Sequence, residues 1–222
     1  MRITRIEPQK KRRGRRNLYA DGQFVLGLSD ETLLRAGLRT GDELSPERLA
    51  ALKRMEERQH AKRTALRYLS TRPRTERELR DRLREAECSD EDIAALLTEL
   101  RHAGLVNDEE FARTFVRDAL THRPTGRRLL RQKMLLLGLE KSLVDTTLDE
   151  LLNTEGQEES ALTSARRYLA KKPAPKSRDQ LHKLRSLVAA HLARRGFSWD
   201  AITPVLHAVL PLHAGPGKDM PE

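Results

Sequence analysis

The chain has 222 residues, of which 37% are hydrophobic, 34% charged and only 4% aromatic, and its formal net charge is +10. This length allows one or two ordinary domains, and the few aromatic residues favour leucine-rich amphipathic helices over a large globular core. With Cys88 as its single cysteine, the chain cannot form an intrachain disulfide, as is typical of proteins in the reducing cytosol. No run approaches the roughly 20 apolar residues of a membrane span, and no secretory signal is evident. We therefore expect a cytoplasmic protein.

The positive net charge favours polyanionic partners. The alternative is that the cationic surface is only solvated and binds no partner.

The first 50 residues predict a small sheet followed by short helices. Ile3 and Ile6 suggest a first strand, and Asp21-Gly22 lies between two runs that suit strands, which is a strong hairpin signal. We place the basic run of residues 10–16 in a loop beside this sheet, where it either contacts phosphates or is only solvated.

Two helices are expected next. Ser29 begins a short helix that ends at Gly37. Ser45 is a suitable N-cap with Pro46 in the first turn, and this second helix runs on through His60 towards the rest of the chain.

The rest of the chain repeats one pattern three times, which is the signature of a repeat architecture. The apolar residues follow gaps of 4, 10, 4 and 3, and gaps of 3 and 4 mark one helix face while the gap of 10 crosses a turn. Cys88, Leu139 and Phe197 precede the second helix of each pair in the position of a hydrophobic staple, so we expect them, and Trp199 beside the last, to pack in the core rather than to stack on bases. The three sets are Leu79, Leu83, Ile93, Leu97 and Leu100; Leu130, Met134, Val144, Leu148 and Leu151; and Val188, Leu192, Ile202, Leu206 and Val209.

An earlier helix precedes each pair, at about 61–70, 108–121 and 158–171. The sequence therefore predicts an all-α fold of three tandem three-helix repeats in an elongated body, with a small N-terminal β-hairpin or sheet extension. The expected regions are a basic N-terminal region (1–50), modules 51–106, 107–153 and 154–212, and a disordered tail rich in Gly and Pro (213–222).

The stretch 104–112 closes one module and opens the next. Gly104 can end a helix in the left-handed conformation, and Asn107 with Glu110 forms a capping-box pattern. Val106 and Phe111 occupy the staple positions. A magnesium site at residues 108–110 is the alternative, but consecutive helical residues point to different faces and do not converge on one ion.

Two stretches resemble conserved blocks of the bacterial RecX family: 68–80, Tyr-Leu-Ser-Thr-Arg-Pro-Arg-Thr-Glu-Arg-Glu-Leu-Arg, and 104–112, Gly-Leu-Val-Asn-Asp-Glu-Glu-Phe-Ala. Residues 123–126 with Leu130 and Gly138 fit the family's middle module, and the hairpin at Asp21-Gly22 is similar to an N-terminal extension that many members carry. The resemblance is weaker in the third module, where Pro173 and Pro175 lengthen a linker.

The resemblance implies a regulator of the recombinase RecA that binds in the groove of the RecA–DNA filament. Such a regulator suppresses ATP hydrolysis, strand exchange and the co-protease activity that drives the SOS response. It implies RecA filaments and, weakly and without sequence preference, single- and double-stranded DNA as partners, and we expect a monomer. A helical protein that acts only by coating DNA is the runner-up.

Basic residues recur at the turn between the first two helices of each module, where guanidinium groups suit phosphates and carboxylates alike. Helical surface charge is the alternative for any single residue. We see no zinc spacing, phosphate-binding loop or nucleophile motif, and expect no catalytic residues, no metal and no cofactor; a nuclease is therefore disfavoured. The candidate binding residues are Lys10, Lys11, Arg12, Arg13, Arg15, Arg16, Arg72, Arg74, Arg77, Arg80, Arg123, Arg127, Arg128, Arg131, Lys171, Lys172, Lys176 and Arg178.

Overall fold

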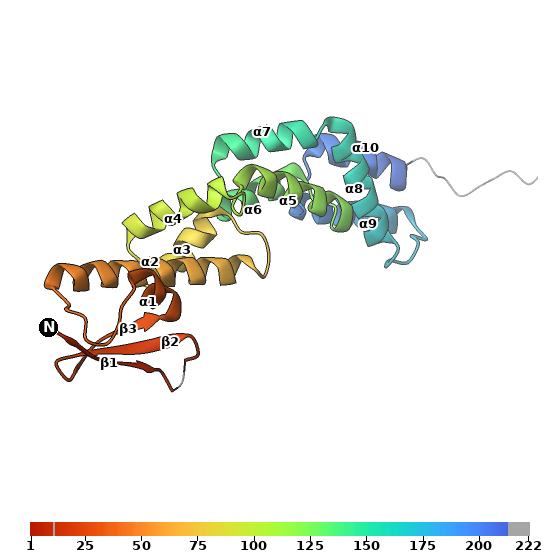
Figure 1. The fold of residues 1–222 in the computed structure, drawn as a ribbon. Helices are drawn as coiled ribbons and strands as arrows, with labels where there is room; N and C mark the ends of the chain where they lie inside the picture. The colour runs from red at the N-terminus through yellow and green to blue at the C-terminus, as the bar shows by residue number, and fades with distance from the viewer. Residues whose placement is uncertain (11, 213–222) are drawn as a thin grey trace, which may run out of the picture. The chain divides into compact units, whose positions relative to one another are not determined.

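The computed structural model describes residues 1–10 and 12–212. Over this part of the chain the protein is mostly helical, with a small three-stranded antiparallel sheet at the N-terminus (Figure 1), so the predicted fold class is confirmed. The expected tail, from His213 on, lies outside the described residues. The strands are β1 (Ile3–Pro8), β2 (Arg15–Ala20) and β3 (Gln23–Ser29); the helices are α1 (Asp30–Ala36), α2 (Pro46–Leu69), α3 (Glu76–Glu85), α4 (Asp90–His102), α5 (Asp108–His122), α6 (Arg127–Leu136), α7 (Lys141–Leu151), α8 (Thr154–Leu169), α9 (Arg178–Arg194) and α10 (Trp199–Val209).

The chain forms two compact units. The first comprises residues 1–74 and 78–106, and the second comprises residues 75–77 and the chain from Asn107 onward. Each unit has hydrophobic cores of its own.

The sheet of the first unit has the strand order β1-β2-β3. The tight turn between β2 and β3 is formed by Asp21 and Gly22, whose φ angles are 49° and 79°. Two consecutive positive φ angles are typical of a two-residue hairpin turn, so the Asp-Gly prediction is confirmed.

Helix α2 belongs to two hydrophobic cores. It begins as predicted, with the Ser45 side chain accepting a hydrogen bond from the Arg48 amide and with Pro46 in the first turn. Its first half contributes Leu52 to the core beneath the sheet, and its second half contributes Ala61 and Ala65 to the core with α3 and α4. A single helix therefore runs across residue 50, the expected end of the N-terminal region, and its two halves pack in different cores.

The repeated apolar residues are the centres of three separate hydrophobic cores. Each core belongs to three helices: α2, α3 and α4; α5, α6 and α7; or α8, α9 and α10. All residues of the three repeated sets are buried except Leu151 and Val209, which are half-buried at the end of their helices. The gaps of 4, 10, 4 and 3 therefore identified the core positions.

The turns before α4, α7 and α10 share one geometry. The residues that end the preceding helices have φ angles of 59°, 86° and 84°, and they are Glu87, Gly138 and Gly196. Ser89 and Ser198, each directly after a staple residue, accept hydrogen bonds from amides in the first turn of the new helix. Glu140 does the same for α7, although glutamate is not among the residue types preferred at this position.

The stretch 104–112 folds largely as its residues predict. Gly104 has a φ angle of 69°, and the Asn107 side chain accepts a hydrogen bond from the Glu110 amide at 3.0 Å. The two staple residues belong to different cores: Val106 is buried in the core with α4, whereas Phe111 packs against the core of α5, α6 and α7.

Two core expectations need correction. Phe197 is buried, but Trp199 is 64% exposed, so the prediction that both pack in the core is wrong for Trp199. Cys88 is half-buried and packs against the edge of its core rather than inside it. Burial and, secondarily, the carboxylate of Asp92 raise the pKa of the Cys88 thiol, which keeps it protonated and unreactive at neutral pH.

Within the second unit, α9 and α6 are joined through their backbones. The Gly126 amide donates to the Arg195 carbonyl oxygen at 2.9 Å, and the Arg128 amide donates to the Gly196 carbonyl oxygen at 3.1 Å. A Cβ atom on Gly126 would lie 2.3 Å from the backbone of Gly196. These two glycines allow the turn after α9 to lie directly on the N-terminus of α6.

Candidate polyanion-binding surfaces

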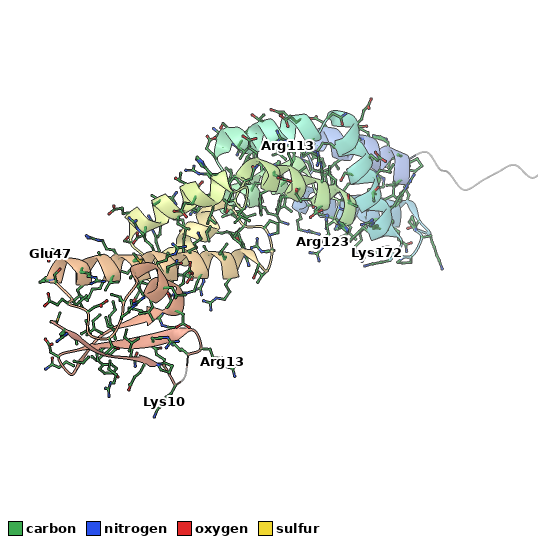
Figure 2. The ribbon with its side chains drawn as sticks, in the orientation of Figure 1. Lys10, Arg13, Glu47, Arg113, Arg123 and Lys172 are labelled. Atoms are coloured by element: carbon green, nitrogen blue, oxygen red, sulfur yellow. The ribbon has the colours of Figure 1, made fainter. Side chains whose placement is uncertain are left out.

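The loop between β1 and β2 presents part of the predicted basic run to solvent. Lys10, Arg12 and Arg13 are exposed, and Figure 2 shows Lys10 and Arg13 extending from this loop. Lys11 lies outside the described residues. These side chains remain candidates for contacts with phosphates.

Arg15 and Arg16, by contrast, form ion pairs within the fold. Arg15 Nη1 lies 2.8 Å from Glu56 Oε1, and Arg15 Nη2 donates to the Gly27 carbonyl oxygen at 3.1 Å. Arg16 Nε lies 2.7 Å from Asp30 Oδ1. The two arginines on β2 thus connect the sheet to α1 and α2, which weakens the case for a role in binding.

Glu56 is the centre of this network, although no local sequence pattern singles it out. Its side chain is only 8% exposed and accepts hydrogen bonds from the Ser29 amide and the Thr32 hydroxyl, each at 2.8 Å. Burial alone raises the pKa of Glu56, but the hydrogen bonds from Ser29 and Thr32, with the charge of Arg15, outweigh it and leave the pKa below its ordinary value. Glu56 is therefore a structural carboxylate.

The candidate arginines around the start of α3 also have partners. Arg72 pairs with Glu78, and the guanidinium of Arg74 lies 4.0 Å from the centre of the Tyr68 ring while its side chain is 15% exposed. Arg80 is half-buried. Arg77 is exposed.

The candidates of the second module, Arg123 after α5 and three arginines on α6, are divided into paired and exposed side chains. Arg131 forms a two-point contact with Asp145, at 2.7 and 3.2 Å, and this contact lowers the pKa of Asp145. Arg127 lies 2.7 Å from Asp149. Arg123 and Arg128 are exposed, and the described residues offer their guanidinium groups no hydrogen bond or ion pair.

The candidates of the third module are all exposed. Lys171, Lys172 and Lys176 follow α8, and Arg178 begins α9. The ammonium group of Lys172 lies 5.4 Å from the centre of the Tyr168 ring. Figure 2 shows Arg123 and Lys172 along the same edge of the second unit.

A cavity of about 230 Å³ in the second unit brings two candidates from different modules together. Arg123, at the end of α5, and Lys171, after α8, both line it. Two further cations, Arg167 on α8 and Arg195 after α9, line it as well and were missed by the sequence analysis. Arg167 has one local sequence signal, because Ser164, Arg167 and Lys171 follow the i, i+3, i+7 spacing of one helix face, whereas this spacing does not include Arg195.

Metal sites and membrane spans are the two other features that would suggest a different function. Among residues 1–10 and 12–212, no group of three His, Cys, Asp or Glu side chains is placed to hold a metal ion. None of the helices there has the length and apolar character that crossing a bilayer demands.

Comparison with protein families identifies three matching regions. Residues 1–45 match the regulatory protein RecX N-terminal domain, residues 61–100 match the first three-helix domain of RecX, and residues 107–148 match the second three-helix domain of RecX. Together these regions include more than half of the chain, and they contain the hairpin and the first two helical modules.

Relatives of known name extend the similarity into the third module. The regulatory protein RecX of Staphylococcus carnosus is 28% identical over 204 residues, covering 92% of this chain and 74% of the relative. The regulatory protein RecX of Clostridium beijerinckii is 26% identical over 211 residues, covering 94% of this chain and 95% of the relative.

Solved structures agree. A crystal structure of regulatory protein RecX superposes with a TM-score of 0.64 at 28% identity, covering 92% of this chain and 98% of the other. RecX from Lactobacillus salivarius, at 23% identity and a TM-score of 0.59 over 69% of this chain and 96% of the other, shares the fold. With three family domains in the expected order and relatives matched over nearly the whole chain, this protein belongs to the RecX family of regulatory proteins.

Proposed function

We propose that this protein binds the RecA–DNA filament and inhibits the ATPase, strand-exchange and co-protease activities of RecA, and thereby modulates recombination and the SOS response. Membership of the RecX family carries this proposal. The net charge of +10 supports it, because a positive protein is attracted to a filament that contains DNA.

The exposed candidate residues of the N-terminal region and of the second and third modules are the proposed contact residues, whereas the candidate arginines of the first module take part in interactions within the fold. The set consists of Lys10, Arg12, Arg13, Arg123, Arg128, Lys171, Lys172, Lys176 and Arg178. They are distributed over the proposed N-terminal region (1–50) and the proposed modules 107–153 and 154–212, so that one chain offers several separate contacts. Weak contacts linked in one chain raise one another's effective concentration, so a monomer without cofactor or catalytic residue suffices for regulation in the cytoplasm.

The alternative is a protein that acts only by coating single- or double-stranded DNA. The same positive charge supports this function, because contacts with DNA phosphates require neither a particular base sequence nor a partner protein. The two functions differ in one requirement: only a filament regulator needs a contact with RecA itself.

Binding to purified RecA after nuclease treatment tests this difference. We expect saturable binding of this protein to immobilised RecA when all nucleic acid has been removed. Binding that disappears with the nucleic acid would favour the DNA-coating function, and a basic protein of similar charge but unrelated fold is the control for non-specific adsorption.

A further inference from the structure

The cavity of about 230 Å³ in the second unit has an unusual lining. Four cationic side chains and two histidines surround it, and no carboxylate of the described residues takes part in the lining. The lining residues are His122, Arg123, Pro124, Ser164, Arg167, Tyr168, Lys171, His191 and Arg195.

A second cavity, between α2 and α4 in the first unit, provides a contrast. It is larger, at about 480 Å³, and it too is lined by several cations. There, however, Asp92 and Glu99 also line the cavity and lie 3.1 and 3.9 Å from Arg58 and Lys62. The fold of the first unit thus supplies counter-charges that the cavity of the second unit lacks.

The basic cavity is held in place by a network of hydrogen bonds. Arg195 Nε donates to the Pro124 carbonyl oxygen at 2.7 Å, and Arg195 Nη2 lies 3.4 Å from the Thr125 hydroxyl. Arg167 Nη1 donates to the His122 carbonyl oxygen at 3.2 Å. Because these interactions use only some of the N–H groups on each guanidinium, the remaining donors stay available to a ligand.

Aromatic groups form one wall of the cavity. The rings of Tyr168 and His191 stack with their centres 4.5 Å apart, and His191 Nε2 lies 3.3 Å from the Ser164 hydroxyl. Arg123 and Lys171 also line the cavity, and both side chains are exposed to solvent. The cavity is therefore partly fixed and partly open to a ligand from solution.

Gathering like charges is unfavourable unless an anion joins them. Burial and the guanidinium groups of Arg123 and Arg167 lower the pKa of Arg195, which records this repulsion. An anion with several acceptor oxygens would relieve it, because one phosphate can accept hydrogen bonds from several guanidinium groups at once. The volume is below the roughly 300–1,000 Å³ of sites that enclose a whole drug-sized ligand, which suits one phosphate group better than an entire nucleotide.

We propose that this cavity, between the C-terminal end of α5 and the C-terminal halves of α8 and α9, is a phosphate-binding site that holds a backbone phosphate of a nucleic-acid strand. A strand is favoured over a free phosphate because further exposed cations, Lys172 and Lys176, continue beyond the cavity along the chain and can meet neighbouring phosphates. The inference deepens the proposed function, since it rests on nucleic acid being part of the target.

The test compares two double variants that remove the same charges. Arg123→Gln with Lys171→Gln removes two exposed cations of the cavity. Arg117→Gln with Lys183→Gln removes one arginine and one lysine that are also exposed in the second unit but do not line the cavity. Circular dichroism and urea unfolding should be unchanged in both, because none of the four side chains is buried.

The first measurement is the affinity of each full-length variant for a fluorescent oligothymidylate, without RecA. The cavity variant should bind roughly tenfold more weakly, as expected when charge-assisted hydrogen bonds are removed, and the control less than twofold. The slope of log affinity against log salt should become shallower by roughly 0.7 for each phosphate of the single strand that the variant no longer neutralises. Equal losses of affinity in the two variants, or no loss in the cavity variant, would overturn the proposal.

The second measurement separates the sources of the anion. Inorganic phosphate should shift the imidazole resonances of His122 and His191 in the wild-type protein, and the oligothymidylate should compete with it. If inorganic phosphate binds but the cavity variant keeps full affinity for the oligothymidylate, the site serves a free phosphate and the assignment to a strand is wrong. If only binding of an oligoglutamate peptide depends on Arg123 and Lys171, an acidic protein is the ligand and the proposal fails. Because RecA is absent throughout, failure here is distinguishable from failure of the proposed regulation.

Discussion

Single residues decide how the N-terminal sheet is joined to α2. The Glu56 carboxylate accepts hydrogen bonds from Ser29 and Thr32 and pairs with Arg15, whose position in the sequence is 41 residues away. Composition and local pattern could identify the basic run, but they could not show that Arg15 and Arg16 are used inside the fold. Their partners are distant in sequence, and no local pattern links them.

Replacing Glu56→Gln should destabilise the protein by about 1.5–3 kcal/mol at pH 7, the range for a hydrogen bond to a charged group. The pKa of Glu56 is lowered below 4.5 in the folded protein, so its stabilising effect is complete above pH 4.5 and is lost as the pH falls through the folded-state pKa. Urea unfolding of wild type and variant at pH 7 and pH 4 measures this difference. The gap between them should narrow at pH 4, and a gap that widens on acidification would contradict the assignment.

Glu87 shows the cost of a side chain in a position that suits glycine. It ends α3 with a φ angle of 59°, where the equivalent turns of the other two modules contain Gly138 and Gly196. A non-glycine residue is strained in this left-handed region, so Glu87→Gly should stabilise the protein by about 0.5–1 kcal/mol despite the greater freedom of the unfolded chain.

Glu85→Gly is the matched control for this substitution. Glu85 is the last residue of α3, is exposed and lies 2.9 Å from Arg82, so the same chemical change should destabilise the protein by about 1 kcal/mol through reduced helix propensity and the loss of this surface ion pair. Chemical denaturation measures both variants. Substitutions that change stability in the same direction would refute the strain argument.

At the scale of helices and turns, the sequence predicted the core faces and the caps, whereas it did not predict the ion pairs. The repeated spacing identified the core faces of α3, α4, α6, α7, α9 and α10, because a helix that packs on one side must place apolar residues at intervals of three and four. Caps were predictable because they too are local: Ser45 and Asn107 accept hydrogen bonds from amides in the first turn of their own helices. Helix faces and caps can be predicted because their residues lie within a few positions of one another in the sequence.

The error at Trp199 has a physical cause that the repeat itself contained. Trp199 is the first residue of α10, and the equivalent first residues of α4 and α7 are Asp90 and Lys141. Both are exposed, so this position faces solvent in every module. Aromatic character alone suggested the core, whereas comparison of the modules indicated the surface.

The close packing of α6 against the turn after α9 leads to a prediction about Gly126. Its φ angle of −75° is open to any residue, so Gly126→Ala introduces no backbone strain of its own. The new methyl group would nevertheless lie 2.3 Å from the Gly196 backbone, and relieving this overlap should cost about 1–3 kcal/mol. Thermal unfolding measures this destabilisation, and a variant as stable as wild type would show that the two turns are not held together as described.

At the scale of the whole chain, sequence and structure contribute differently to function. The sequence showed the net charge and the repeats and predicted the family, and matches to three RecX domains confirm the family. It could not predict that Arg123, Arg167, Lys171 and Arg195 line one cavity. Arg167 lies on α8 and the other three follow the ends of α5, α8 and α9, up to 72 positions apart in the sequence, and only the packing of the modules brings them together.

Because the exposed cations are distributed over several regions of the chain, we expect each region to contribute to binding. Each contact is weak and sensitive to salt, and linkage within one chain supplies the avidity. The central claim is that the protein acts on the RecA filament and does not merely compete for DNA.

Steady-state ATP hydrolysis by RecA on preformed filaments, with and without excess single-stranded DNA, tests this claim most directly. This protein should slow hydrolysis at near-stoichiometric amounts, and the inhibition should persist when the excess DNA is added after filaments have formed. The Arg123→Gln, Lys171→Gln variant should inhibit less than the Arg117→Gln, Lys183→Gln control. Full restoration of the rate by the excess DNA, or no inhibition at stoichiometric protein, would contradict the account.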